Sequence, residues 1–213
     1  LHKIYCLDLE FHKYFKNYDF HNLYKELLNF CTVDLSAFYF DIRKDTLYCD
    51  PKNSEKRKST LIILNVILDS LIKWFAPILS FTTEEIYQLV FKKNKSIHLE
   101  KFLKFPKNFK NDELNQKWLE LIKIRNKCNI SIEEKRASKE IGSSLEAELR
   151  IKIDDKFKQI FKNIDFSELC ITSKAEITYD KAAELEVITK KMRGKKCSVC
   201  WKISPETCTR HPE

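Results

Sequence analysis

Four residues near the end of the chain have the types and the spacing of a metal site. Cys197 and Cys200 form a C-x2-C pair, and Cys208 and His211 form a C-x2-H pair after seven intervening residues. Thiolate and imidazole groups are preferred ligands of Zn²⁺, and two such pairs supply all four positions of a tetrahedral site. Because protein fills every position, none is left for water or substrate. The pattern therefore predicts a structural zinc knuckle rather than a catalytic metal.

The same residues leave two points open. A lone C-x-x-C can be a redox pair, although such a pair would not need Cys208 or His211. Cys208 and His211 could also be bystanders that bind no metal. The remaining cysteines are isolated from one another, and without a secretory signal they are expected to be small buried thiols rather than disulfides.

Positive charge surrounds the first cysteine pair, and Trp201 follows Cys200 directly. Cations neutralise phosphate and an indole can stack on an unpaired base, so this basic lip is a candidate RNA contact. The alternative is that Trp201 packs against the zinc module. The cationic residues of the lip are Lys190, Lys191, Arg193, Lys195, Lys196 and Lys202.

The composition of the chain limits its possible partners and the kinds of site it can contain. The chain has 213 residues, a net charge of +8 and a pI of about 8.9, which favours nucleic acid or an anionic membrane surface as a partner. Its 2 glycines are too few for a Rossmann or P-loop phosphate site. No stretch approaches the roughly 18 apolar residues of a transmembrane helix. No pairing of nucleophile and base is visible, so no catalytic residue is predicted.

Helices are expected to form most of the chain before this site. Apolar residues at helical spacing predict an antiparallel bundle. Asp19 and Ser54 are expected to cap its second and third helices, and Thr82 with Glu85 fits a capping box for the fourth. The expected helices span 1–17, 20–44 or beyond, about 55–76 and about 82–91.

The stretch Leu35–Asp50 organises the bundle, because its apolar residues fall on one helix face and its charged residues mostly on another. Trp74 and Phe81 are expected in the core. Arg57 and Lys58 belong to a basic first turn of the third helix, which is unfavourable against the helix dipole and indicates an anionic group facing them. The alternative is an ordinary solvated run of charge.

The pattern changes in the second half. Residues 92–111 are expected to be a linker, and a long helix then begins near residue 112 and ends near Lys139, with Gly142 as a left-handed cap. Arg125 is expected at the edge of the apolar stripe of this helix. Alternation beyond it predicts a small α+β unit with a short helix at Phe157–Ile164. The expected strands are Arg150–Ile153, Leu169–Thr172, Ala175–Tyr179 and Glu184–Lys190.

The predicted fold is mainly α, ending in a small α+β domain and a zinc knuckle. We divide it into four parts. They are a helical bundle at 1–110, a long connecting helix at 111–142, a small α+β junction domain at 143–190, and a zinc-finger module, truncated at its end, at 191–213.

Five strings along the chain share a pattern with one known family. They are LSAFYFDIRKDTLYCD (35–50), RKSTLIILNVILDSLIKWFAPILSFTTEEIY (57–87), EKRASKEIGSSLEAEL (134–149), SELCITS (167–173) and KKCSVCWK (195–202). With them, the chain resembles the C-terminal portion of bacterial isoleucyl-tRNA synthetases, which are class I aminoacyl-tRNA synthetases. Val199 stands where the family has Arg, and His211 stands where it has its last Cys. In some members of the family His-Pro-Glu stands just before the second pair, so the resemblance leaves a cysteine beyond Glu213 as an alternative to His211 as the fourth ligand.

The resemblance implies an anticodon-binding helical domain, a junction domain and a zinc finger that bind the anticodon arm of isoleucine tRNA. It implies a cytoplasmic, monomeric ligase that uses ATP and Mg²⁺ to attach L-isoleucine to its tRNA and edits misactivated valine, without a membrane. Those active sites belong to an upstream catalytic domain and an inserted editing domain, outside this stretch. The expected tRNA contacts are Lys44, Arg57, Lys58, Arg136, Arg193, Lys195, Lys196 and Trp201.

Three other interpretations are weighed beside this one. The chain could be the equivalent region of a valyl- or leucyl-tRNA synthetase, which shares the bundle. It could be a stand-alone zinc-containing protein that binds nucleic acid without an enzyme attached. It could also be a helical scaffold with an incidental knuckle, which predicts no binding that depends on the anticodon.

Overall fold

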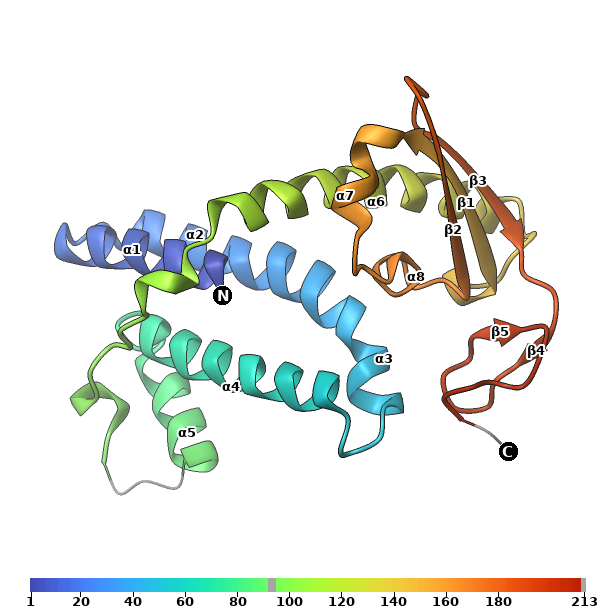
Figure 1. Cartoon of the computed structure of the whole chain (residues 1–213). Coiled ribbons are helices and arrows are strands. Elements are labelled where there is room, and N and C mark those ends of the chain that lie inside the picture. Colours follow the sequence, from blue (N-terminus) through green and yellow to red (C-terminus); the bar gives the residue numbers. More distant parts are fainter. Residues whose placement is uncertain (92–94, 212–213) are drawn as a thin grey trace. The chain divides into compact units, whose positions relative to one another are not determined.

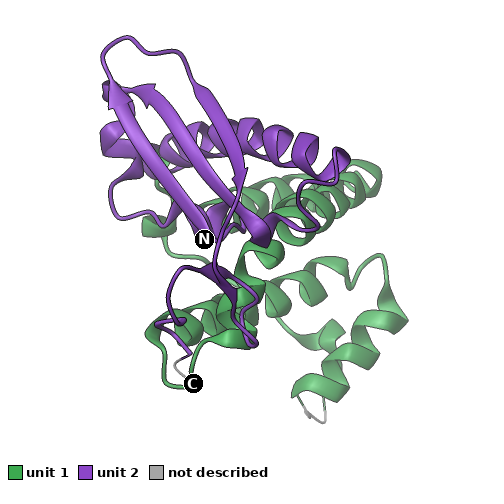
Figure 2. Ribbon diagram, turned by 90° about the vertical axis from the view of Figure 1, so that its right-hand side faces the viewer, with its two compact units in different colours: residues 1–112 green, residues 113–213 purple. Residues whose placement is uncertain are grey.

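The computed structural model describes residues 1–91 and 95–211, and the chain divides into two units, Leu1–Asp112 and Glu113–Glu213 (Figure 2). Most described residues are helical, and a small mixed sheet and a Cys/His cluster lie in the second unit, as the sequence predicted. The finer division into four parts stays a prediction. Within the described ranges, no helix combines the length and the apolar character needed to cross a membrane.

Unit 1 is built from helices (Figure 1). Two of the predicted caps are confirmed: the carboxylate of Asp19 accepts the backbone N–H of Asn22 at 3.2 Å, and the hydroxyl of Ser54 accepts that of Arg57 at 3.4 Å. Both side chains satisfy amides that the first helical turn leaves without partners. The helices are α1 (His2–Lys16), α2 (Phe20–Asn29), the π-helix η1 (Phe30–Phe40), α3 (Asp41–Cys49), α4 (Glu55–Phe75) and α5 (Ser80–Phe91).

The second predicted helix is continuous from α2 through α3, but its middle segment, η1, winds as a π-helix. A π-turn holds more residues than an α-turn, so the expected spacing of the apolar face shifts within it. Leu35 and Ile42 are buried as expected, whereas Phe38 and Tyr39 are half-buried.

Aromatic rings form the centre of unit 1. Phe11 is fully buried between Trp74 and Phe102, with ring centroids 6.0 and 4.9 Å away. Trp74 is 1% exposed, which confirms its predicted place in the core, and its Nε1–H donates to Oδ1 of Asp8 at 3.2 Å. Because that carboxyl is partly buried, desolvation raises the pKa of Asp8.

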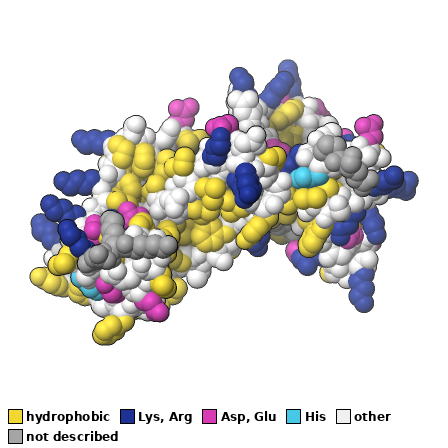
Figure 3. All heavy atoms as spheres, turned by 90° about the horizontal axis from the view of Figure 1, so that it is seen from below, with side chains coloured by type: hydrophobic (Ala, Val, Ile, Leu, Met, Phe, Trp, Pro, Cys, Tyr) yellow, Lys and Arg dark blue, Asp and Glu magenta, His cyan; other side chains and the backbone are white. Residues whose placement is uncertain are grey.

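The expected start of the fourth helix is wrong. The helix α5 begins at Ser80, so Thr82 lies inside it and caps nothing. The buried positions of α5 are Thr83 and Tyr87, four residues apart, and this register leaves Phe81 93% exposed rather than in the core. Figure 3 shows that hydrophobic side chains are also exposed at the left of the view.

The predicted linker falls partly outside the described residues, because 92–94 are not described. Its described part, 95–111, contains two short 3-10 helices, η2 (Ile97–Leu99) and η3 (Lys107–Phe109). Ile97 is buried against Tyr87, and the carboxylate of Glu84 accepts the N–H of Ile97 at 2.8 Å. The segment around Ile97 therefore packs against α5.

Unit 2 places the long helix α6 (Asp112–Ala137) along a three-stranded sheet of order β2-β1-β3 (Figures 1 and 2). The central strand β1 runs parallel to β2 and antiparallel to β3. The buried side of β1 alternates strictly, with Leu149, Ile151 and Ile153 facing the core. The remaining elements are η4 (Ser144–Glu146), β1 (Ala147–Asp154), η5 (Asp155–Phe157), α7 (Lys158–Phe161), α8 (Phe166–Leu169), β2 (Lys174–Asp180), β3 (Glu186–Lys191), β4 (Lys195–Lys196) and β5 (Ile203–Ser204).

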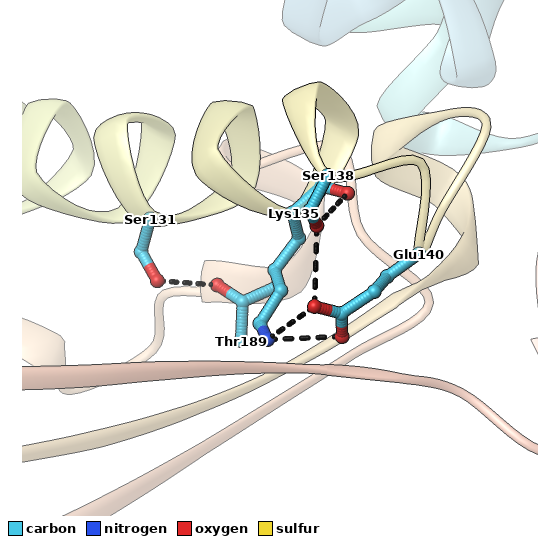
Figure 4. Close-up of polar contacts among 5 residues, drawn as sticks. All are labelled: Ser131, Lys135, Ser138, Glu140 and Thr189. Carbon is cyan, nitrogen blue, oxygen red and sulfur yellow. Dashed lines mark hydrogen bonds and ion pairs between the residues drawn. The ribbon is translucent and has the colours of Figure 1, made fainter.

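Polar contacts close the end of α6 (Figure 4). The ammonium of Lys135 contacts both carboxylate oxygens of Glu140, at 2.8 and 2.9 Å, and the hydroxyl of Ser138 donates to the same carboxylate at 3.1 Å. One turn earlier, the hydroxyls of Ser131 and Thr189 lie 2.7 Å apart and join α6 to β3. These contacts fix the helix on the sheet and define where it stops.

Three expectations about unit 2 are wrong. Residues Leu169–Thr172 form the end of α8 and a turn, with Ile171 at φ 57°, rather than a strand. Arg125 is 9% exposed rather than at an edge, because its Nε–H donates to the carbonyl of Leu169 at 2.8 Å. The left-handed residue after α6 is Lys139, at φ 60°, and not Gly142.

Candidate metal centre and nucleic-acid interface

The structure brings the four predicted metal ligands together. The ligand atoms of Cys197, Cys200, Cys208 and His211 all lie within 4.8 Å of one another. The sulfurs of Cys200 and Cys208 are 3.8 Å apart, and Nδ1 of His211 lies 3.5 Å from the sulfur of Cys208 and 3.6 Å from that of Cys197. Cys200 is buried and the other three are half-buried, so the cluster is largely closed to solvent.

These separations fit a tetrahedral zinc ion. Bonds of about 2.3 Å to sulfur and about 2.0–2.1 Å to nitrogen place two sulfurs about 3.8 Å apart, and a sulfur and a nitrogen about 3.5 Å apart. Three of the six edges of the cluster, at 3.8, 3.5 and 3.6 Å, agree with these values, and all six are within 4.8 Å. The separation between Cys200 and Cys208 is far longer than the roughly 2.05 Å of a disulfide. The donor set and its geometry can therefore hold a metal ion.

A small hairpin presents the first cysteine pair. In the knuckle, which we define as residues 195–211, β4 pairs with β5 so that Lys196 lies opposite Ile203. Beyond this pairing, the N–H of Cys197 donates to the carbonyl of Lys202 at 2.9 Å, and the N–H of Val199 donates to the sulfur of Cys197 at 3.4 Å. The C-x2-C loop is thus the tip of the hairpin.

One glycine leads into the knuckle. Gly194 has φ +140°, and a Cβ built on it would lie 2.1 Å from the carbonyl oxygen of Ser204. Only glycine adopts that conformation readily and leaves room for the opposite backbone. A side chain at Gly194 would therefore force β4 and β5 apart.

The thiols of the cluster differ in acidity. Backbone hydrogen bonds, first from Cys200 and then from Val199, lower the pKa of Cys197 to about 6. Desolvation raises the pKa of the buried Cys200 to about 11. Desolvation acts against ionisation of Cys208 too, but backbone hydrogen bonds from Arg210 and His211 still leave its pKa lowered. Because metals bind thiolates, a metal held here would displace the proton that the raised pKa keeps on Cys200.

Four of the five predicted RNA contacts of unit 2 lie within this knuckle or directly before it. Arg193, Lys195 and Lys196 are exposed between the end of β3 and the hairpin tip. Trp201 is 59% exposed, and the ammonium of Lys196 lies 5.5 Å from the centre of its ring. More than half of the indole is therefore accessible. Arg136 lies apart from this group, near the end of α6, and forms an ion pair with Glu133 at 2.7 Å.

The predicted contacts of unit 1 have local partners. Lys44 pairs with Asp41 at 3.2 Å, and Lys58 pairs with Glu55 at 2.8 Å. Arg57 is half-buried, and its guanidinium donates to the carbonyl of Asp50 at 3.0 Å. Arg57 thus holds the turn between α3 and α4, while the tRNA role of all three cations stays a prediction.

Sequence reasoning did not single out Ser173. Its hydroxyl accepts the N–H of Ile203 in β5 at 2.6 Å and donates to the carbonyl of Leu145. A single serine between a helix and a strand belongs to no periodic pattern of apolar residues, so the sequence does not indicate its contacts. The one available indication was its place in the string SELCITS, which resembles the family.

Comparison with known proteins gives a consistent result. A family model described as the anticodon-binding domain of tRNA ligase matches residues 1–153. The isoleucine–tRNA ligase of Pelagibacter ubique (strain HTCC1062) is 62% identical over 100% of this chain. Those of Agrobacterium fabrum and Bradyrhizobium diazoefficiens are 37% and 39% identical over 97% and 92% of it.

The chain spans only 24%, 22% and 21% of the length of these three relatives. The matched family model, in contrast, covers residues 1–153, which is well over half of the chain. That model and the relatives confirm the resemblance predicted from the sequence strings. The chain belongs to the family of anticodon-binding domains of tRNA ligases.

Proposed function

We propose that this chain is the part of an isoleucine–tRNA ligase that recognises the anticodon arm of isoleucine tRNA. The observation that carries the proposal is the identity of 62% to one such ligase across all 213 residues. The match includes the helical unit, the sheet and the knuckle. A stand-alone nucleic-acid-binding protein would not be expected to match a ligase in all three of these regions.

The chemistry of the knuckle supports an RNA contact. Arg193, Lys195 and Lys196 provide positive charge that can neutralise phosphates of the anticodon arm. The exposed indole of Trp201 can stack on a base that the anticodon loop leaves unpaired, with the ammonium of Lys196 near the same ring. Phosphate contacts set position and the stacked base adds discrimination.

We propose zinc as the metal of the four-residue cluster, with Cys197, Cys200, Cys208 and His211 as its ligands. A bound zinc ion supplies folding energy to a segment that has little core of its own. The side chains of the cluster perform no reaction in this proposal. They hold the hairpin tip so that Trp201 and its basic neighbours keep one arrangement.

The proposal assigns the reaction of the whole ligase to other parts of the protein. An upstream catalytic domain of the same chain would use ATP and Mg²⁺ to attach isoleucine, and an editing domain would remove misactivated valine. The whole ligase would be a cytoplasmic monomer. This chain contributes the tRNA contacts and no catalytic group.

Equilibrium binding tests the proposal. The chain, loaded with zinc, is titrated with isoleucine tRNA and with the same tRNA carrying a swapped anticodon, at two salt concentrations. We expect the native anticodon to bind more tightly at both. Equal binding that collapses for both tRNAs as salt rises would leave only phosphate attraction and would overturn the proposal. Valine and leucine tRNAs form a third arm, which tests the sister-ligase alternative.

A further inference from the structure

Ser173 joins the sheet of unit 2 to the knuckle. Its backbone N–H donates to the carbonyl of Ala147 at the start of β1, at 3.1 Å. Its hydroxyl donates to the carbonyl of Leu145 in η4 and accepts the N–H of Ile203 in β5 at 2.6 Å. One half-buried residue therefore connects its own segment to two others that are far apart in sequence, the junction of η4 with β1 and the strand β5.

The knuckle has a small hairpin of its own, so its orientation depends on contacts outside that hairpin. The hairpin strands β4 and β5 are two residues long and form a sheet separate from β2-β1-β3. The segment that leads into it is anchored by Met192, which is buried and whose N–H donates to the carbonyl of Glu146 at 2.7 Å. That anchor lies before Gly194, so it fixes the entry to the hairpin but not its rotation. The bond from Ile203 to Ser173 adds the second point that a fixed orientation needs.

We propose that Ser173 is a positioning residue that sets the orientation of the knuckle on the sheet, and thereby the direction in which Trp201 and the basic lip face. The part of this inference that concerns RNA rests on the proposed function. A serine hydroxyl can donate and accept at once, which is what Leu145 and Ile203 require. Alanine would leave both backbone groups without this partner.

The orientation is separable from metal binding. Ile203 belongs to the hairpin strand and is not a metal ligand. A change at Ser173 therefore leaves the four ligand side chains in place. Loss of the hydrogen bond between Ser173 and Ile203, which we call the clamp, is expected to make the orientation of the whole knuckle more variable while the metal stays bound.

The test compares three variants of the zinc-loaded chain. Ser173→Ala removes the hydroxyl, and Ser173→Thr keeps it. Ser138→Ala is the matched control, because the hydroxyl of Ser138 bonds only within the turn that ends α6, to Lys135 and Glu140 (Figure 4). Hydrogen exchange at the amide of Ile203, zinc affinity and affinity for isoleucine tRNA are measured for each.

For Ser173→Ala we expect faster exchange at Ile203, zinc affinity within about twofold of the parent chain, and tRNA affinity reduced about three- to tenfold, the size of one hydrogen bond. Ser173→Thr should restore all three values, and Ser138→Ala should leave them unchanged. A merely structural role would lower thermal stability without this split between zinc and tRNA.

Unchanged exchange at Ile203 in Ser173→Ala, or failure of Ser173→Thr to restore it, would overturn the inference. If Ser173→Ala does not fold, the Thr variant decides: exchange at Ile203 faster than in the parent chain overturns the clamp. If the parent chain does not prefer the native anticodon, the proposed function fails. The exchange rate at the amide of Ile203 still tests the hydrogen bond to Ser173, because that measurement does not involve RNA.

Discussion

The bundle of unit 1 and the knuckle of unit 2 differ in what fills their interiors. In the bundle, Phe11 and Trp74 are buried among other rings and aliphatic side chains. In the knuckle, Val199 and Trp201 are 50% and 59% exposed, and the interior consists of three sulfurs and one imidazole. Burial of apolar surface stabilises the first region, and the ligand cluster must stabilise the second. The two regions should therefore fail independently and under different treatments.

Removal of the metal should give the largest effect and should stay within the knuckle. Structural zinc binds comparable peptides with about 10–16 kcal/mol, so Cys200→Ser or a chelator should unfold residues 195–211. Helical circular dichroism from α1–α5 should not change. Val199→Ala, between the ligands, is the control and should keep the metal. A large loss of helical signal on chelation would show that the bundle also depends on the metal.

The second test concerns the core of the bundle. Trp74→Ala should lower the free energy of unfolding of unit 1 by about 3–5 kcal/mol, because it leaves a cavity beside Phe11 and removes the donor to Asp8. Urea denaturation measures the change. Phe81→Ala is the matched control at a fully solvated ring, expected within about 0.5 kcal/mol of the parent chain. Comparable losses in the two variants would place Phe81 in a packed site after all.

The third test separates binding from stability. Trp201→Ala should weaken tRNA binding by about 1–3 kcal/mol, the contribution of one stacked base, without a change in melting temperature. Tyr48, an aromatic residue in α3 that is 82% exposed, provides the control Tyr48→Ala. Equal losses from both variants, or none from Trp201→Ala, would contradict a specific stacking role for the knuckle.

The smallest expected effect is a pH dependence in the bundle. Glu84 accepts hydrogen bonds from Gln88, Ser96 and the N–H of Ile97, and these lower its pKa below the ordinary 4.5. A lowered folded-state pKa adds stability above the unfolded value, and that stability is lost as pH falls through the folded value. Melting temperature should therefore fall below about pH 4.5 more steeply in the parent chain than in Glu84→Gln. Parallel curves would show that these bonds do not favour the carboxylate.

Local signals in the sequence predicted local structure well. Asp19 and Ser54 act as caps because a cap needs only amides two or three residues away. The cluster of Cys197, Cys200, Cys208 and His211 could be predicted because the spacing within each pair is what a tetrahedral metal site requires, while the role of the four side chains as ligands stays a proposal. The burial of Trp74 was also predicted correctly.

Features that depend on distant partners could not be predicted in this way. The burial of Arg125 depends on a carbonyl 44 residues away, and the role of Ser173 depends on an amide 30 residues away. Phe81 was misplaced because α5 starts two residues earlier than expected. Phe81 therefore lies in the first turn of the helix, outside the side that Thr83 and Tyr87 bury, and nothing in the composition of this stretch indicates the earlier start. Periodicity reports the face of an element, but it does not report which element covers that face.

The position of β1 between β2 and β3 also imposes an order on folding during synthesis. The middle strand cannot be fully paired until Lys191 has left the ribosome, since Ala147 pairs with it. The knuckle follows β3 in the chain, so it emerges after the strands and meets a sheet that already presents Ser173. Chains grow from the N-terminus and their domains fold as units in that order. Metal capture by the knuckle would then come after the surface that receives the knuckle has formed.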